Sequence, residues 1–111
     1  MLEKIQDWMT GKHRRRYKRR DRDMCVCVIN GQTYPVENWS LGGLLIQADE
    51  RMFPVGQDIY FTLKFKIGLK ILEVRHKASI VRKSQTRVGL KFHPLTPSPT
   101  QKLRQVISEN G

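Results

Sequence analysis

Residues 59–67 read IYFTLKFKI. The side chains at positions 59, 61, 63, 65 and 67 are apolar, whereas those between them are a tyrosine, a threonine and two lysines. Because successive side chains of a β-strand point to opposite faces of the sheet, this pattern predicts a strand with one buried and one wet face. Such strands are typical of antiparallel sheets.

The chain on both sides continues in short strands. Residues 24–29 are β-rich and end at Asn30-Gly31, a strong signal for a two-residue hairpin turn. Further strands are predicted over 33–37, 44–48, 69–81 (with a bulge near Arg75) and 88–92. The spacing of Leu103, Val106 and Ile107 predicts a short amphipathic helix over 100–109.

Six strands joined by short turns favour antiparallel pairing, and closure into a barrel removes exposed sheet edges. We therefore expect a mainly β protein: a six-stranded antiparallel barrel with a C-terminal α-helix and a flexible, arginine-rich N-terminal arm. The 111 residues suffice for one core. Residues 1–11 are expected to form a short N-terminal helix or extension, and residues 12–109 the domain.

The charge of the chain is concentrated in one segment. The formal net charge is +11, and residues 12–22, here called the basic arm, contribute +7 of it with eight lysines and arginines against one aspartate. Such a cluster favours an anionic partner: a phosphate, a nucleic acid or a membrane surface. A solvated charged segment without a partner is the alternative interpretation.

Several classes of site and location are not expected. Cys25 and Cys27 would point to one face of a strand, which indicates two buried, reduced thiols. The three histidines lack zinc-type spacing, so we expect no metal and no cofactor. No signal peptide or apolar run long enough to span a membrane is present, which favours a cytoplasmic protein. No nucleophile–base–acid set emerges, so we expect no enzymatic activity.

One group of residues suited to an anionic partner lies in the basic arm. Arg14, Arg15 and Arg19 form the pattern R-R-x-x-x-R. The planar guanidinium fork matches the O6/N7 edge of guanine and also pairs with two phosphate oxygens. Arg16 and Arg20 have the same spacing, so spacing alone leaves the register of the arginine pair open.

The second group is Asn38, Ser40 and Gly43, in the pattern N-x-S-x-x-G, which we expect in the loop at residues 38–43. The short side chains of Asn38 and Ser40 can bond a guanine edge, a phosphate or the loop's own backbone. Gly42 and Gly43 allow positive φ and a close approach of a ligand to the backbone. Trp39 either stacks on a base or packs onto the barrel.

Taken in this order, the residues resemble the PilZ domain family, whose signature is R-x-x-x-R, a strand hairpin and then [D/N]-x-S-x-x-G. The resemblance continues through the pattern GxxIYFTLKF at 56–65, ASIVR at 78–82, VGLKF at 88–92 and the final helix. It covers about residues 13–108.

The resemblance implies a six-stranded barrel that binds cyclic di-GMP as a second-messenger receptor. Arg15 and Arg19 would be the two motif arginines, a register we prefer because Tyr17 then falls where the family often has an aromatic residue. Arg14 occupies the family position associated with a stacked pair of ligand molecules. Further ligand-binding residues would be Asn38, Ser40 and Gly43, with Arg16, Arg20, Trp39 and Gly42 as additional candidates.

One departure from the family pattern concerns Asn38, which stands where an aspartate is commoner. The overall expectation is a non-enzymatic cyclic di-GMP receptor, with one ligand or a stacked dimer, that couples the second messenger to a downstream protein partner. Two alternatives remain: a small nucleic-acid-binding barrel that uses the basic arm, and a PilZ-like protein-interaction adaptor that binds no nucleotide. Few aromatic side chains on the predicted strands count against the nucleic-acid reading.

Overall fold

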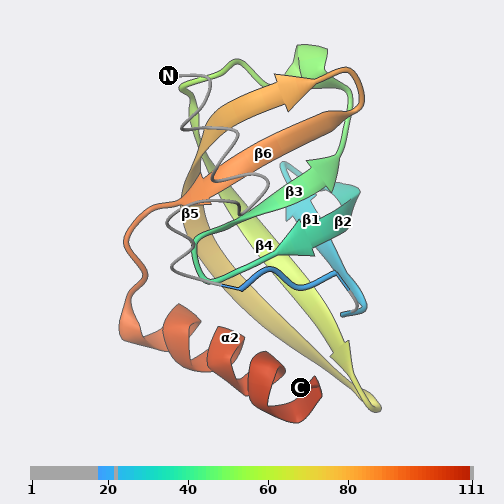
Figure 1. Ribbon diagram of the computed structural model, residues 1–111, viewed down its shortest axis with the longest axis vertical. Coiled ribbons are helices and arrows are strands. Elements are labelled where there is room, and N and C mark those ends of the chain that lie inside the picture. The colour runs from blue at the N-terminus through green and yellow to red at the C-terminus, as the bar shows by residue number, and fades with distance from the viewer. Residues whose placement is uncertain (1–17, 22, 111) are drawn as a thin grey trace.

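The protein is described by a computed structural model, which covers residues 18–21 and 23–110. The protein folds into a closed six-stranded antiparallel barrel with one C-terminal helix, as predicted (Figure 1). The elements are β1 (Cys25–Ile29), β2 (Gln32–Trp39), β3 (Gly43–Gln47), the 3₁₀ helix η1 (Glu50–Met52), β4 (Asp58–Ile67), β5 (Lys70–Ser84), β6 (Arg87–Phe92) and α2 (Pro97–Asn110).

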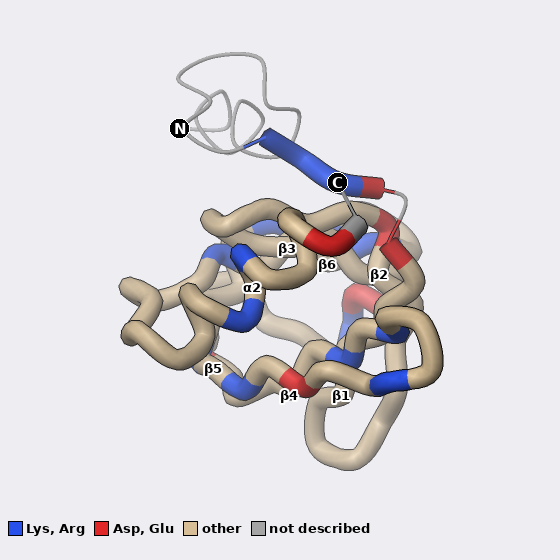
Figure 2. The backbone as a smooth tube through the Cα atoms, turned by 90° about the horizontal axis from the view of Figure 1, so that it is seen from below, with Lys and Arg blue, Asp and Glu red and all other residues tan. Residues whose placement is uncertain are grey.

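The strands follow the order β1-β2-β3-β6-β5-β4 around the barrel, and β4 closes it against β1. Viewed from below, they surround a common interior (Figure 2). The first hairpin confirms its turn signal, because Asn30 and Gly31 have φ angles of 51° and 79° and Ile29 pairs with Gln32 across the turn. Two successive positive φ values are what a type I′ turn requires. The predicted N-terminal helix lies outside the described residues.

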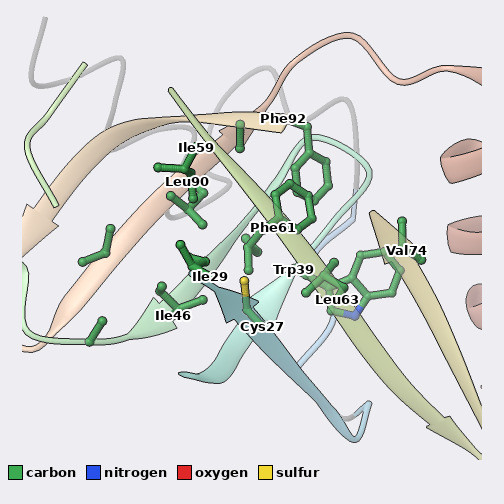
Figure 3. Packing of buried hydrophobic residues seen from close by; sticks show 14 of the residues in the cluster. Cys27, Ile29, Trp39, Ile46, Ile59, Phe61, Leu63, Val74, Leu90 and Phe92 are labelled. Atoms are coloured by element: carbon green, nitrogen blue, oxygen red, sulfur yellow. The ribbon is translucent and has the colours of Figure 1, made fainter. Parts of the chain in front are cut away.

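The barrel interior is filled by the alternating residues of β4 together with side chains from all the remaining strands (Figure 3). The largest fully buried side chain is Trp39, whose ring lies 5.1 Å from that of Phe65, edge to face. Helix α2 adds Leu103 and Val106, both fully buried, against β4 and β5. The alternation at residues 59–67 therefore marks the inward side of β4, as predicted.

Three features of the secondary structure differ from the predictions. Strand β2 runs on to Trp39, because Asn38 and Trp39 pair with Leu45 and Leu44 of β3 instead of forming a loop. Strand β5 keeps a regular register with β4 through Arg75, so the bulge expected there is wrong, and the irregularity lies between Ile80 and Arg82, opposite β6.

The third difference is the start of α2, which begins at Pro97 instead of Thr100. Pro97 and Pro99 both lie in the first turn, where proline is tolerated because its missing N–H would have no partner within the helix. In the described part of the chain, no helix combines the length and the apolarity needed to cross a bilayer.

Candidate functional site

The geometry of the site begins with an irregularity in β2. Val36 pairs with Ile46 and Asn38 pairs with Leu45, so Glu37 is an extra residue opposite one step of β3. Such a bulge reverses the alternation of the strand. Without it, Asn38 would share the inward face of Val36; with it, Trp39 turns into the core and only 1% of its surface is exposed.

The described part of the basic arm, residues 18–21, pairs with this end of β2. Arg20 and Trp39 form an antiparallel bridge, in which the Arg20 amide donates to the Trp39 carbonyl at 2.7 Å and the Trp39 amide donates to the Arg20 carbonyl at 3.0 Å. The guanidinium of Arg20 also lies over the Trp39 ring, 5.8 Å from its centroid. The arm was expected to be mobile throughout; at Arg20 it instead pairs with the barrel.

A carboxylate that sequence reasoning missed holds this bridge in place. Asp23 accepts two hydrogen bonds from Arg20, at 2.7 and 3.0 Å, and one from the indole nitrogen of Trp39 at 2.9 Å. Its side chain is only 2% exposed, and that of Arg20 is 18% exposed. The hydrogen bonds from Asp23 raise the pKa of Arg20 further above its ordinary value. The only sequence signal was an acid between the end of the basic arm and the first strand.

Arg19 lies next to this anchored pair and reaches the second motif. Its Nη1 donates a hydrogen bond to Oδ1 of Asn38 at 2.8 Å. Because neighbouring residues of an extended segment face opposite ways, Arg19 turns toward Asn38 while Arg20 turns toward Asp23 and the core. The chain thus brings one arginine of the R-x-x-x-R pattern to the N-x-S-x-x-G pattern, across nineteen positions.

The loop after β2 is organised by Ser40. Its Oγ accepts a hydrogen bond from the Gly42 amide at 3.0 Å, and its own amide donates to the Gly43 carbonyl at 2.8 Å. The sequence offered three partners for this hydroxyl: a guanine edge, a phosphate or the loop's own backbone. In the structure, the hydroxyl bonds the loop backbone. Among the described glycines, those with positive φ are Gly31, Gly56 and Gly68, so Gly42 and Gly43 do not use the positive φ that glycine allows.

These residues share one shallow crevice, with about 10 Å³ of room, at the surface of the barrel. It is lined by Arg19, Asn38, Trp39, Ser40, Gly43 and Leu44. The space is far too small to enclose a nucleotide, so a ligand of that size would lie on the surface, between the loop and the arm. Figure 2 shows the described part of the arm running along the outside of the barrel.

The predicted site residues therefore divide into three groups. Arg19, Asn38, Ser40 and Gly43 come together in the crevice, and Gly42 joins them through its bond to Ser40. Arg20 faces Asp23, and the Trp39 ring packs in the core instead of lying free to stack on a base. Arg14, Arg15 and Arg16 lie outside the described residues.

A second polar cluster has the residue types of a hydrolytic triad but a different geometry. Ser79 Oγ donates to Asp58 Oδ1 at 2.6 Å, and His93 Nε2 lies 3.1 Å from Ser79 Oγ and 3.0 Å from Asp58 Oδ1. In a triad, serine and carboxylate bind the two different nitrogens of the imidazole. Here both contact the same nitrogen, so the cluster lacks the geometry of a triad. Its hydrogen bonds link β4, β5 and the segment between β6 and α2.

Known structures share this fold at low sequence identity. The Bacillus subtilis inhibitor of motility (MotI/DgrA) matches with a TM-score of 0.70 and 20% identity, over 88% of this chain and 51% of that one. YcgR from Escherichia coli, solved in complex with c-di-GMP, matches with a TM-score of 0.63 and 21% identity, over 86% of this chain and 45% of that one.

The PilZ domain of CeSA from a cellulose-synthesizing bacterium matches with a TM-score of 0.57 and 15% identity, over 85% of this chain and 99% of that one. The chain thus spans about half the length of MotI and of YcgR, and nearly all of the isolated CeSA domain. No curated protein matches it in sequence. The family model for the PilZ domain matches residues 13–109, and no enzymatic family is indicated. The chain therefore belongs to the PilZ domain family.

Proposed function

We propose that this protein is a non-enzymatic receptor for cyclic di-GMP that couples the level of this second messenger to a downstream protein partner. Membership of the PilZ family supports the ligand class. YcgR, a structural neighbour, was solved in complex with c-di-GMP. The proposal needs a site on this chain that presents guanidinium groups and small polar groups to one guanine-bearing dianion.

The observation that carries the proposal is the contact between Arg19 and Asn38, at 2.8 Å, beside Ser40 and Gly43. It joins the two halves of the family motif on the barrel surface. It also favours the register Arg15/Arg19 over Arg16/Arg20, because the guanidinium of Arg20 is already bound to Asp23. In this proposal, the ligand takes over the contact that Nη1 of Arg19 makes with the amide oxygen of Asn38.

In this proposal, Arg15 and Arg19 grip the guanine edges and the phosphates. Asn38 and Ser40 bond the base from the barrel side, and Gly42 and Gly43 let it approach the loop backbone. Two phosphates and two guanidinium groups form charge-assisted hydrogen bonds, which are about twice as strong as neutral ones. Ordering of the arm against the loop then presents a new surface to the protein partner.

Calorimetric titration with cyclic di-GMP, with GMP and GTP as controls, tests the ligand directly. Arg19→Ala removes one bidentate contact, worth roughly 1–3 kcal/mol, so we expect affinity to fall by about 5- to 150-fold. The matched control is Arg104→Ala, which removes an exposed arginine of α2 with the same change in charge. Equal affinities of the two variants would remove Arg19 from the site.

The stoichiometry of the same titration tests the role of Arg14. If Arg14 holds the second molecule of a stacked pair, the wild-type protein binds two ligands and Arg14→Ala binds one. A single ligand on the wild-type protein would contradict the stacked pair while leaving the receptor proposal intact.

A further inference from the structure

The hairpin formed by β4 and β5 projects beyond the rest of the sheet. Strand β1 pairs with β4 only as far as Phe65, and β6 joins β5 only from Ala78 onward. Residues 66–71, here called the hairpin tip, therefore extend past the barrel, with Gly68 at a φ of 60° in the turn. Figure 1 shows this tip as the lowest point of the sheet.

The hairpin tip carries apolar side chains that the barrel does not cover. Leu69 is fully exposed and Ile71 is 59% exposed. Met24, 66% exposed, lies on the other side of Lys66 from Ile71, because its carbonyl accepts a hydrogen bond from the Lys66 amide and Lys66 pairs with Ile71. Met24, directly before β1, thus forms one row with Lys66 of β4 and Ile71 of β5 on the outward face of the sheet.

Positive charge surrounds these apolar side chains. No aspartate or glutamate occurs in residues 59–72, whereas Lys64, Lys66 and Lys70 do. The next acid, Glu73, lies 4.0 Å from Lys64 and 3.5 Å from Arg75, so basic side chains offset its charge. The tip is therefore convex, aliphatic at its apex and cationic around it.

We propose that the hairpin tip docks this protein on an anionic lipid bilayer. A bilayer offers an apolar layer for Leu69, Ile71 and Met24 below a negatively charged surface for the lysines, whose long side chains reach headgroups while their stems lie along apolar surface. A projecting tip meets a flat membrane without obstruction from the barrel. Nucleic acid fits less well, because base stacking needs aromatic faces and the exposed side chains of the tip are aliphatic.

This docking is independent of nucleotide binding, and it is tested by co-sedimentation with phosphatidylcholine vesicles that contain or lack phosphatidylserine. The wild-type protein should sediment with the anionic vesicles only. The double variant Leu69→Ser/Ile71→Ser should lower the partition coefficient by about tenfold or more, because burial of two aliphatic side chains is lost. Both residues are exposed, so the barrel should remain folded.

The matched control is Met52→Ser/Val55→Ser, which removes two exposed apolar side chains near η1, at the other end of the barrel (Figure 1). It should sediment like the wild-type protein. The basic arm could also attract anionic vesicles through charge alone. Equal sedimentation of the two double variants would assign binding to that attraction and overturn the proposal, as would a wild-type protein that stays in the supernatant.

Discussion

The residue with the most consequences for the candidate site is Asp23, which binds no ligand in our proposal. Its carboxylate accepts hydrogen bonds from Arg20 and from the indole of Trp39 while its side chain is 2% exposed. Asp23→Ala would leave a mostly buried guanidinium and an indole N–H without this acceptor. We expect the free energy of unfolding in urea to fall by about 2 kcal/mol.

The matched control for Asp23 is Asp49→Ala. Asp49 also pairs with an arginine, Arg51, but that pair is exposed, and exposed pairs contribute little. The control should lose much less stability than Asp23→Ala, because it removes only this exposed pair and the cap that Asp49 gives the Arg51 amide at the start of η1. Because Asp23 also fixes the bridge that places Arg19, Asp23→Ala should weaken cyclic di-GMP binding severalfold with every motif residue intact. Unchanged stability and affinity would show that Asp23 does not hold the arm.

A second prediction at the residue scale concerns the two free thiols on β1. Burial raises the pKa of Cys25 and of Cys27 to about 12, so both stay protonated near neutral pH. Iodoacetamide should label them slowly in the folded protein and quickly in guanidinium chloride, as read by mass spectrometry. Rapid labelling of Cys27 in the folded state would contradict its burial.

The same pKa shifts have a defined sign for stability. A thiol in the unfolded chain titrates near pH 8.5, below its folded value. The contribution to stability is therefore complete below about pH 8.5 and is lost as the pH rises toward 12. The thiols thus add to the loss of stability in alkali and have no effect in acid.

At the scale of the element, the bulge at Glu37 decides which side chains of β2 face outward. Deleting Glu37 would remove the extra residue and restore simple alternation. Val36 would then directly precede Asn38, so Asn38 would still face outward and Trp39 would still face the core. Because Trp39 stays buried, we expect the deletion variant to unfold cooperatively and to lose no more than about 1 kcal/mol. Trp39→Ala, which empties the same core position, should cost about 3 kcal/mol or more. Circular dichroism and tryptophan fluorescence during urea unfolding would measure this.

Glu37→Ala is the matched control, because it keeps the length of the strand and removes only the partly exposed contacts of Glu37 with Arg87 and Gln47. It should cost less than about 1 kcal/mol. The deletion and the substitution should therefore unfold alike. A deletion variant whose tryptophan becomes exposed to solvent would show that Glu37 is not the extra residue of the bulge.

This bulge also marks the limit of the sequence-based prediction. Alternation on β4 and the Asn30-Gly31 turn are local patterns, and both predicted the barrel correctly. The end of β2 was wrong because an extra residue breaks the period that strand prediction relies on. The structural anchoring by Asp23 was missed because its partners, Arg20 and Trp39, meet only through the fold. The contact of Arg19 with Asn38 followed from family resemblance and not from periodicity.

At the scale of the whole molecule, the net charge of +11 suits either of two anionic partners: a small dianion or a long nucleic-acid polymer. A polymer contacted at six to ten phosphates loses about 10³–10⁵ in affinity between 50 and 200 mM salt, because many counterions are released. A dianion releases few. We expect the affinity for cyclic di-GMP to fall by less than about tenfold over this range. A steep salt dependence, matched by tight binding of single-stranded DNA, would favour the nucleic-acid alternative.

The most direct test of the account is nitrogen-15 chemical-shift mapping of the protein during titration with cyclic di-GMP. We predict saturable shifts concentrated at the Nε groups of Arg15 and Arg19 and at the amides from Asn38 to Gly43, with the outward face of β4 unchanged. Shifts that cluster on the face around Tyr60 while the amides of residues 38–43 stay still, or the lack of any saturable shift, would contradict convergence of the arm and the loop on one ligand.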